Sequence, residues 1–188
     1  MDIIENQKKV QWEAETPVLI IDQADQSNEE KAVATNNEKD TMSNPEDAKA
    51  LADIEKYGCH ILRVMEEGDE PPFSYTIGMR KSSHHPDLIV VGLSQELSHS
   101  ILNEYSRRVK AGEKFIDGDT VSGFLEGFDC QLKKVNKKHH KNYLGWALWL
   151  YKKEDFEYLQ LVYPNTQGVW PWDPKAKPAF VQIQPLLQ

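Results

Sequence analysis

The segment "CHILRVMEEGDEPPFSYTIGM", residues 59–79, decides the fold. Two apolar runs, 59–65 and 73–79, flank a polar turn that contains one glycine and two prolines, and this pattern predicts a β-hairpin. The next segment, "DLIVVGL" at residues 87–93, is a continuous apolar run, which is typical of a central strand buried on both faces. These three segments predict the first part of a β-sheet.

Two helices are signalled on either side of this sheet segment. Residues 45–57 begin after a capping residue, Asn44, and end before Gly58, which stops a helix readily. Residues 95–110 follow Ser94, a second capping residue. Their apolar side chains recur at helical spacing, so we expect this second helix to lie on the sheet with one apolar face.

The C-terminal half continues the mixture of strands and helices. Residues 128–135 alternate between apolar and polar side chains and predict a strand, and residues 137–151 predict a third helix that is apolar nearly all round its second half. We expect a second hairpin from 156–163 to 169–170 and a final edge strand at 179–186. The sequence thus predicts an α+β fold with a mainly antiparallel sheet of about five or six strands and three helices packed on it.

Charge and composition divide the chain into two parts. Residues 1–43 are interpreted as an acidic N-terminal arm and linker, and residues 44–188 as a single α+β domain. Within the arm, Val18 to Ile21 predict a short strand that docks on the main body or on a partner. The net charge is −8, and the first 50 residues hold twelve acidic against five basic side chains. This acidity makes nucleic acid an improbable partner and favours capture of a basic protein.

The remaining composition predicts a reduced, cytoplasmic protein. Only two cysteines occur, Cys59 and Cys130, and each lies in an apolar run that points it at the core. No apolar stretch reaches the roughly 20 residues needed to cross a bilayer, so we expect no membrane association. The first residues also lack the basic-then-apolar order of a signal peptide.

Motifs for catalysis and cofactor binding are missing. The histidines do not have the spacing of metal ligands, and neither a G-x-S-x-G nor a G-x-G-x-x-G pattern occurs. Ser122 lacks a recognisable strand and helix context. We therefore predict no catalytic residue, no metal and no cofactor, and favour a non-catalytic role. His85 is interpreted as ordering the turn before residues 87–93 through a hydrogen bond to the backbone.

A basic cluster, "KKVNKKHHK" at Lys133–Lys141, precedes and begins the third predicted helix. Cations at a helix N-terminus oppose its dipole, although each such contact costs at most about 1 kcal/mol. Three interpretations stay open: a solvated turn, a site for an anion or nucleic acid backbone, or a surface on which the chain's own acidic arm folds.

The segment "LQLVYPNTQGVWPWDP", residues 159–174, concentrates rigid aromatic side chains between prolines. Tyr163, Trp170 and Trp172 offer large apolar area at low ordering entropy, which is typical of interface hot spots. The alternative is that the tryptophans fold inward to cap the core while Asp173 binds nearby backbone amides.

Four segments in this order resemble the bacterial family called domain of unknown function 4262. They are "EEGDEPPFSYTIGM" (66–79), "HPDLIVVGL" (85–93), "LQLVYPNTQGVWPWDP" (159–174) and "QPLL" (184–187), and the resemblance covers about residues 55–187. It implies one α+β domain of bacterial type and attaches no reaction to the chain.

Two hypotheses from different functional classes follow. The first is a non-catalytic protein-binding module, in concrete form an immunity or antitoxin-like protein that neutralises a basic bacterial toxin. Its predicted contact residues are Tyr163, Trp170, Trp172, Asp173, Trp146 and Trp149. The alternative is a small-molecule enzyme or ligand-binding domain whose cleft is lined by Tyr75, His85, Gln160, Trp172 and Asp173. A nucleic-acid accessory protein that uses Lys133–Lys141 is a third reading.

Overall fold

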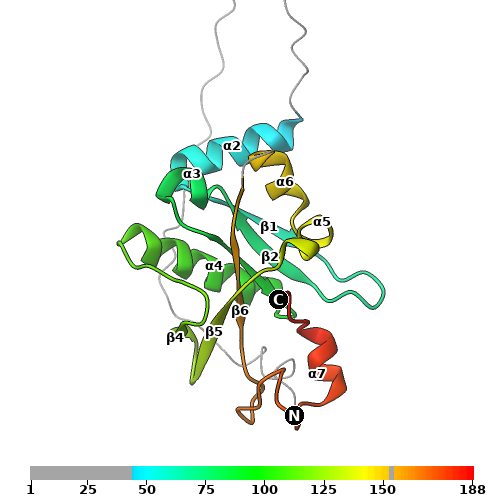
Figure 1. Cartoon of the computed structure of the whole chain (residues 1–188). Coiled ribbons are helices and arrows are strands. Elements are labelled where there is room, and N and C mark those ends of the chain that lie inside the picture. Colours follow the sequence, from blue (N-terminus) through cyan, green and yellow to red (C-terminus); the bar gives the residue numbers. More distant parts are fainter. Residues whose placement is uncertain (1–43, 153–154) are drawn as a thin grey trace, which may run out of the picture.

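A six-stranded sheet with helices on both faces forms the body of the protein (Figure 1). The computed structural model describes residues 44–152 and 155–188, so the predicted acidic arm and its strand at Val18 to Ile21 lie outside the described residues. The strands are β1 (His60–Val64), β2 (Phe73–Ile77), β3 (Asp87–Val91), β4 (Thr120–Leu125), β5 (Phe128–Lys134) and β6 (Tyr158–Val162). The helices are α2 (Pro45–Tyr57), α3 (Met79–Ser83), α4 (Gln95–Lys110), η1 (Lys137–His139), α5 (His140–Tyr143), α6 (Gly145–Tyr151) and α7 (Pro178–Ile183).

The strand order is β1-β2-β3-β6-β5-β4. Every neighbouring pair in this sheet is antiparallel except β3 and β6, which run parallel with Ile89 opposite Gln160. The predicted fold class, an α+β protein with a mainly antiparallel sheet, is therefore confirmed. The predicted hairpin of β1 and β2 and the central position of β3 are confirmed as well.

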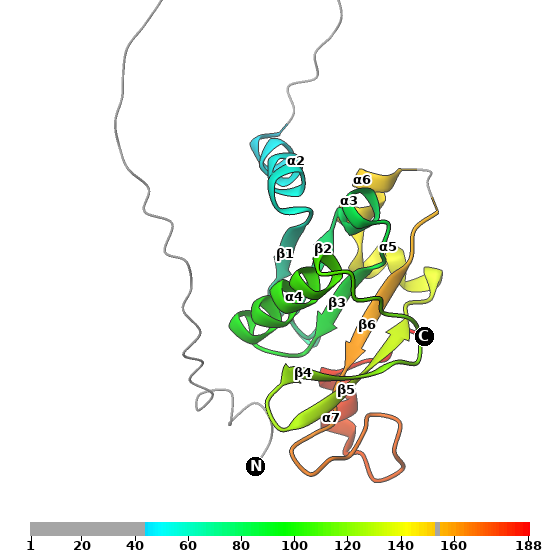
Figure 2. The ribbon, with the colours of Figure 1, turned by 90° about the vertical axis from the view of Figure 1, so that its left-hand side faces the viewer.

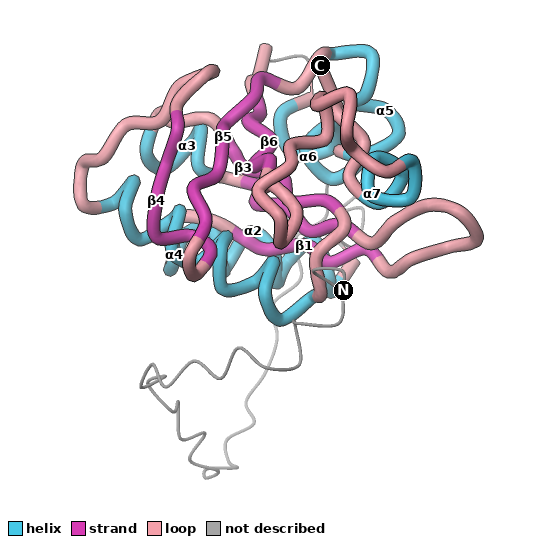
Figure 3. Tube along the Cα trace, turned by 90° about the horizontal axis from the view of Figure 1, so that it is seen from below, coloured by secondary structure: helices cyan, strands magenta, loops and turns pink. Residues whose placement is uncertain are grey.

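Each face of the sheet supports its own apolar core. Figure 3 shows α4 on one side of the strands and α5 and α7 on the other. Side chains of β3 alternate between the two cores: Leu88 and Val90 pack with α4, whereas Ile89 and Val91 pack with α6 and the C-terminal segment. All five residues of β3 are buried because both faces of the strand are covered.

The capping signals of the two long helices are confirmed. The Asn44 side chain accepts a hydrogen bond from the Glu46 amide, and Gly58 ends α2 in the left-handed conformation with φ of 77°. The Ser94 hydroxyl accepts a hydrogen bond from the Leu97 amide at 3.3 Å and caps the N-terminus of α4. These local hydrogen bonds satisfy backbone groups that have no partner inside the helix.

The predicted helix 137–151 is instead three short pieces, η1, α5 and α6. The chain leaves helical geometry at Leu144, where φ is −122° and ψ is 41°, directly before Gly145. Glycine has a low helix propensity, and the break lets the fully buried Leu144 reach the core.

The predicted second hairpin and the final edge strand are wrong. Residues 164–168 do form a turn, with the Asn165 amide bonded to the Val169 carbonyl, but 169–170 do not return as a strand. Both edges of β6 are already occupied, by β3 and by β5. Residues 178–183 form α7, which starts with Pro178 at its first turn. The strand that the sequence did not reveal is β4, which contains Ser122 and pairs with β5.

Candidate functional site

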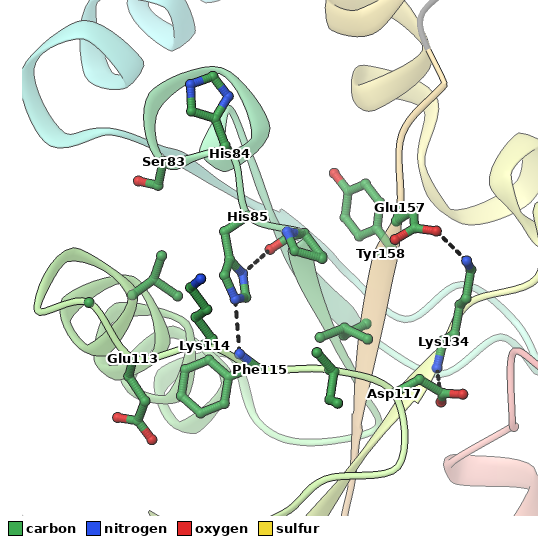
Figure 4. Close-up of a pocket in the computed structure, with 15 residues that line it drawn as sticks. Ser83, His84, His85, Glu113, Lys114, Phe115, Asp117, Lys134, Glu157 and Tyr158 are labelled. Atoms are coloured by element: carbon green, nitrogen blue, oxygen red, sulfur yellow. Dashed lines mark hydrogen bonds and ion pairs between the residues drawn. The ribbon is translucent and has the colours of Figure 1, made fainter.

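A cleft opens where the parallel strands β3 and β6 begin (Figure 4). Its volume is about 490 Å³, and its walls come from the turn after α3, the loop after α4 and the start of β6. An adjoining hollow of about 570 Å³ shares His84, His85, Pro86 and Glu157 with it. Side chains around the two hollows carry both signs of charge: Arg80, Lys81, Lys114, Lys134, Glu113, Asp117, Asp155 and Glu157.

His85 in this cleft has both ring nitrogens engaged. Its Nε2 accepts the Phe115 amide at 3.0 Å, and its Nδ1 lies 3.2 Å from the Pro86 carbonyl and 3.1 Å from the Tyr105 hydroxyl (Figure 4). An acceptor at Nε2 requires the neutral ring, and burial lowers the pKa of His85 in agreement. The interpretation of His85 as the residue that orders this turn is confirmed. The ring fixes the turn and also ties the loop after α4 to it.

The neighbouring His84 is exposed and adopts a left-handed backbone conformation, with φ of 51° and ψ of 35°. Such a conformation is unfavourable for a residue with a side chain, by about 1 kcal/mol or more. Because His84 ends α3 in this way, its imidazole stands at the rim of the cleft.

The residue after Pro86 carries a buried carboxyl group, Asp87, which sequence reasoning missed. Its Oδ1 accepts from the Thr76 hydroxyl at 2.8 Å and from the Met79 amide at 3.2 Å, and its Oδ2 accepts from the Tyr151 hydroxyl. The Tyr151 hydroxyl in turn accepts the Gly78 amide at 2.8 Å. Burial raises the pKa of Asp87 to about 6, although these hydrogen bonds oppose the shift. The carboxyl joins β2, α3, β3 and α6, and so helps to fix α3, whose last residue lines the cleft.

The basic cluster Lys133–Lys141 finds anionic partners within its own domain. Lys134 forms an ion pair with Glu157, and Lys137 lies 2.7 Å from Asp155. Both pairs are exposed, so solvent screens them and their contribution to stability is small. These contacts give two cations of the cluster anionic partners within the domain.

The aromatic loop, residues 163–177, leaves β6 at the opposite end of the sheet from this cleft (Figure 1). Trp170 and Trp172 stack with ring centroids 4.9 Å apart and planes 10° apart. Lys133 from β5 lies 5.3 Å from the Trp172 ring centroid. Trp172 is 42% exposed and Trp170 is half-buried, whereas Tyr163 is buried and donates to the Val91 carbonyl. Asp173 accepts the Lys175 amide at 2.8 Å.

A second pair of tryptophans lies on α6. Trp146 and Trp149 meet edge to face with centroids 5.4 Å apart, and Trp149 is 37% exposed beside Leu148 at 38%. Because β6 separates α6 from the aromatic loop, the two pairs lie at opposite ends of the sheet (Figures 1 and 2). Tyr163 is buried in the core and is therefore not a surface contact residue, whereas the other predicted contact residues lie in two separate patches.

The residues of the alternative cleft do not come together. Tyr75 is buried in the core beneath α6, where its hydroxyl accepts the Trp146 amide at 3.4 Å. Gln160 is fully buried and bonds to the Pro185 carbonyl and the Leu187 amide. Of that set, His85 alone lines the cleft described above, together with residues that the sequence did not single out.

Within residues 44–152 and 155–188, no three His, Cys, Asp or Glu side chains gather as a group that could hold a metal ion. No helix in the same part of the chain is both long and apolar enough to span a membrane. Both cysteines are buried and unpaired.

Comparison with known proteins identifies one protein family. The model of a family described as a domain of unknown function (DUF4262) matches residues 53–177. No curated protein and no solved structure matches the chain. The match contains the cleft, both tryptophan pairs and all strands of the sheet.

Proposed function

We propose that this chain, which belongs to the DUF4262 family, is a non-catalytic protein-binding module. In its concrete form it is an immunity or antitoxin-like protein that captures a basic toxin. The function is carried by contacts with another protein, and the aromatic loop supplies the anchor.

The observation that carries this proposal is the stacked pair of Trp170 and Trp172. The pair is held in place before any partner arrives, because the flanking Pro164 and Pro171 are buried and Lys133 lies against Trp172. Rigid indoles lose little conformational entropy on binding, and tryptophan is enriched among residues that dominate interface energies. Nearly half of the Trp172 surface is exposed at the rim of the loop.

Charge supports the choice of a basic partner. The whole chain carries −8, and the excess acid lies in its first 50 residues. Opposite charge accelerates the encounter of two proteins, while a buried aromatic anchor slows their separation. The two features would thus act on different steps of the same binding reaction.

A second candidate function is the binding of a small polar ligand in the cleft around His84 and His85. The strained backbone of His84 favours it, because left-handed residues with side chains concentrate at functional sites. The volume of about 490 Å³ suits a small molecule. Native mass spectrometry of the purified chain would favour this candidate if it found a small molecule that remains bound.

The test of the binding module compares Trp172→Ala with Trp149→Ala, an equally exposed tryptophan on the other patch. Proteins captured from a lysate of the source cells by each variant and by the wild-type chain are identified by mass spectrometry. The affinity of the recovered partner is then measured by calorimetry. We expect Trp172→Ala to weaken binding about 30-fold, corresponding to about 2 kcal/mol, while Trp149→Ala has a smaller effect. Equal affinities for wild type and Trp172→Ala would refute the role of the aromatic loop.

A further inference from the structure

Residues of α2, β1 and α4 line a groove. Strand β1 is at the opposite edge of the sheet from β4, and Figure 2 shows how α2, β1 and α4 are arranged. Its volume is about 640 Å³. Lys49, Asp53 and Tyr57 line it from one face of α2, since they follow each other at four-residue spacing. One face of α4 forms the opposite wall.

Positive charge dominates this groove. The wall residues include Lys49, Arg63 and Lys110, and none of the three has an anionic partner within residues 44–152 and 155–188. The lining carboxylate, Asp53, is already bound to His60 at 2.7 Å. The groove therefore holds cations whose charge is not balanced locally.

One residue that lines the groove, His99, carries an unsatisfied polar atom. The Nδ1 of His99 is buried and has no hydrogen-bond partner among the described residues. Burial and the nearby Arg63 lower the pKa of His99, so its ring is neutral at pH 7. A buried nitrogen without a partner is unfavourable, so a turn of the His99 ring that brings Nδ1 to a polar group of an occupant would stabilise the bound state.

The floor of the groove is a strand edge. β1 is the outermost strand and pairs only with β2 among the described strands, so half of its backbone hydrogen-bonding groups face outward. An extended segment adds readily to such an edge, with main-chain hydrogen bonds for affinity and side-chain contacts for specificity. An occupant with a short strand and several carboxylates would pair with the free backbone groups of β1 and neutralise the cations of the groove.

We propose that the groove binds an extended acidic segment, and that residues 18–30 of this same chain supply it. This segment, "VLIIDQADQSNEE", begins with the apolar run Val18 to Ile21 and continues with four acidic side chains. Thirteen residues, 31–43, connect it to the first residue before α2 and can extend over about 40 Å. Because α2 forms one wall of the groove, such a tether holds the segment near the site at an effective concentration of about 1 mM.

The contact lies within one molecule, at a different place from the aromatic loop that anchors the proposed toxin partner. It also differs from the interpretation in which the arm covers Lys133–Lys141, because Lys134 and Lys137 in that cluster already pair with Glu157 and Asp155.

The test attaches a spin label to the full-length chain at Ser27→Cys and records the signal intensities of its backbone amides by NMR. At about 0.02 M NaCl we expect loss of intensity for Arg63, His99 and Lys110, and recovery at about 0.5 M NaCl, because salt screens exposed charges. The label should leave the far helix α7 unaffected. Mixing labelled chain with unlabelled, isotope-enriched chain separates a contact within one molecule from a contact between two.

Two charge-reversal variants complete the experiment. Arg63→Glu with Lys110→Glu should abolish the loss of intensity in the groove. The matched control, Lys138→Glu with Lys141→Glu, makes the same change of net charge in the other basic cluster and should leave the loss unchanged. If the labelled wild-type chain showed no loss of signal intensity in the groove at low salt, that result alone would overturn the proposal. So would a loss confined to Lys133–Lys141, or one that appears only between molecules.

Discussion

Replacing Tyr151 with phenylalanine should destabilise the protein strongly and in a pH-dependent way. The substitution removes the hydroxyl that donates to Asp87 and accepts the Gly78 amide, while the ring stays in the core. A hydrogen bond to a charged group contributes about 1.5 to 3 kcal/mol, and an unpaired buried amide costs about 1 to 3 kcal/mol. We therefore expect the free energy of unfolding at pH 8 to fall by about 2.5 kcal/mol or more.

The dependence on pH follows from the carboxyl group. Burial raises the pKa of Asp87 to about 6, so its carboxyl is ionised in the wild type at pH 8 and largely protonated at pH 5. The lost hydroxyl stabilised the ionised form, and Tyr151→Phe therefore raises this pKa further in the folded state. The folded variant then binds more protons than the folded wild type above pH 6, and its relative stability falls as pH rises. At pH 5 the destabilisation should shrink by about 1 kcal/mol or more, since a neutral hydrogen bond contributes less than a charged one.

Urea unfolding at pH 5 and pH 8, followed by tryptophan fluorescence, measures both quantities. Tyr143→Phe is the matched control, because the half-buried Tyr143 has no hydroxyl hydrogen bond to a described residue. Its effect should stay below about 1 kcal/mol at both pH values. A destabilisation by Tyr151→Phe of less than about 1 kcal/mol at pH 8, or one that is the same at both pH values, would refute the assigned role of the Asp87 network.

Three further substitutions test how turns and loops are fixed. Gly92→Ala should cost about 3 kcal/mol or more and loosen α7, because a Cβ there would lie 2.2 Å from the Ile183 carbonyl oxygen at a φ of 81°. Gly112→Ala, with a similar φ and no atom within 4 Å, should cost only the backbone strain of about 1 kcal/mol, and thermal unfolding compares the two. His85→Gln should reduce the loss of stability on acidification below pH 6.5, which urea unfolding measures. Burial lowers the pKa of His85 in the folded wild type, so the unfolded chain takes up the proton first and stability falls with pH. The side-chain oxygen of Gln can still accept a hydrogen bond from the Phe115 amide. The variant and the wild type should therefore differ little in stability at pH 8 and more at pH 5, where only the wild type has lost stability through His85.

Sequence reasoning succeeded where the signals are local. The hairpin of β1 and β2, the buried strand β3 and the caps Asn44 and Ser94 are each specified by a few adjacent residues. It failed at β6, because the turn after this strand has the local chemistry of a hairpin. Whether such a turn continues into a paired strand depends on which edges are free, and distant segments of the chain occupy both edges of β6.

The sites were predictable only in part for the same reason. Trp172 and Lys133 were both singled out, but their contact depends on the aromatic loop folding back toward β5, which no short pattern encodes. His85 was assigned to its turn, whereas the loop that brings Phe115 to its other nitrogen lies 30 residues away. Asp87 gave no signal, because an acidic residue before an apolar run usually marks a solvated strand end.

The parallel contact between β3 and β6 has a consequence for how the protein is made. Strands β1 to β3 can assemble as soon as they leave the ribosome, but the second edge of β3 has to wait for β6, which is synthesised after α4, β4, β5 and α6. During that interval an apolar strand edge stays available to other nascent chains. We therefore expect overproduction to be limited by aggregation of incomplete chains, and slower translation or a lower growth temperature to improve the soluble yield.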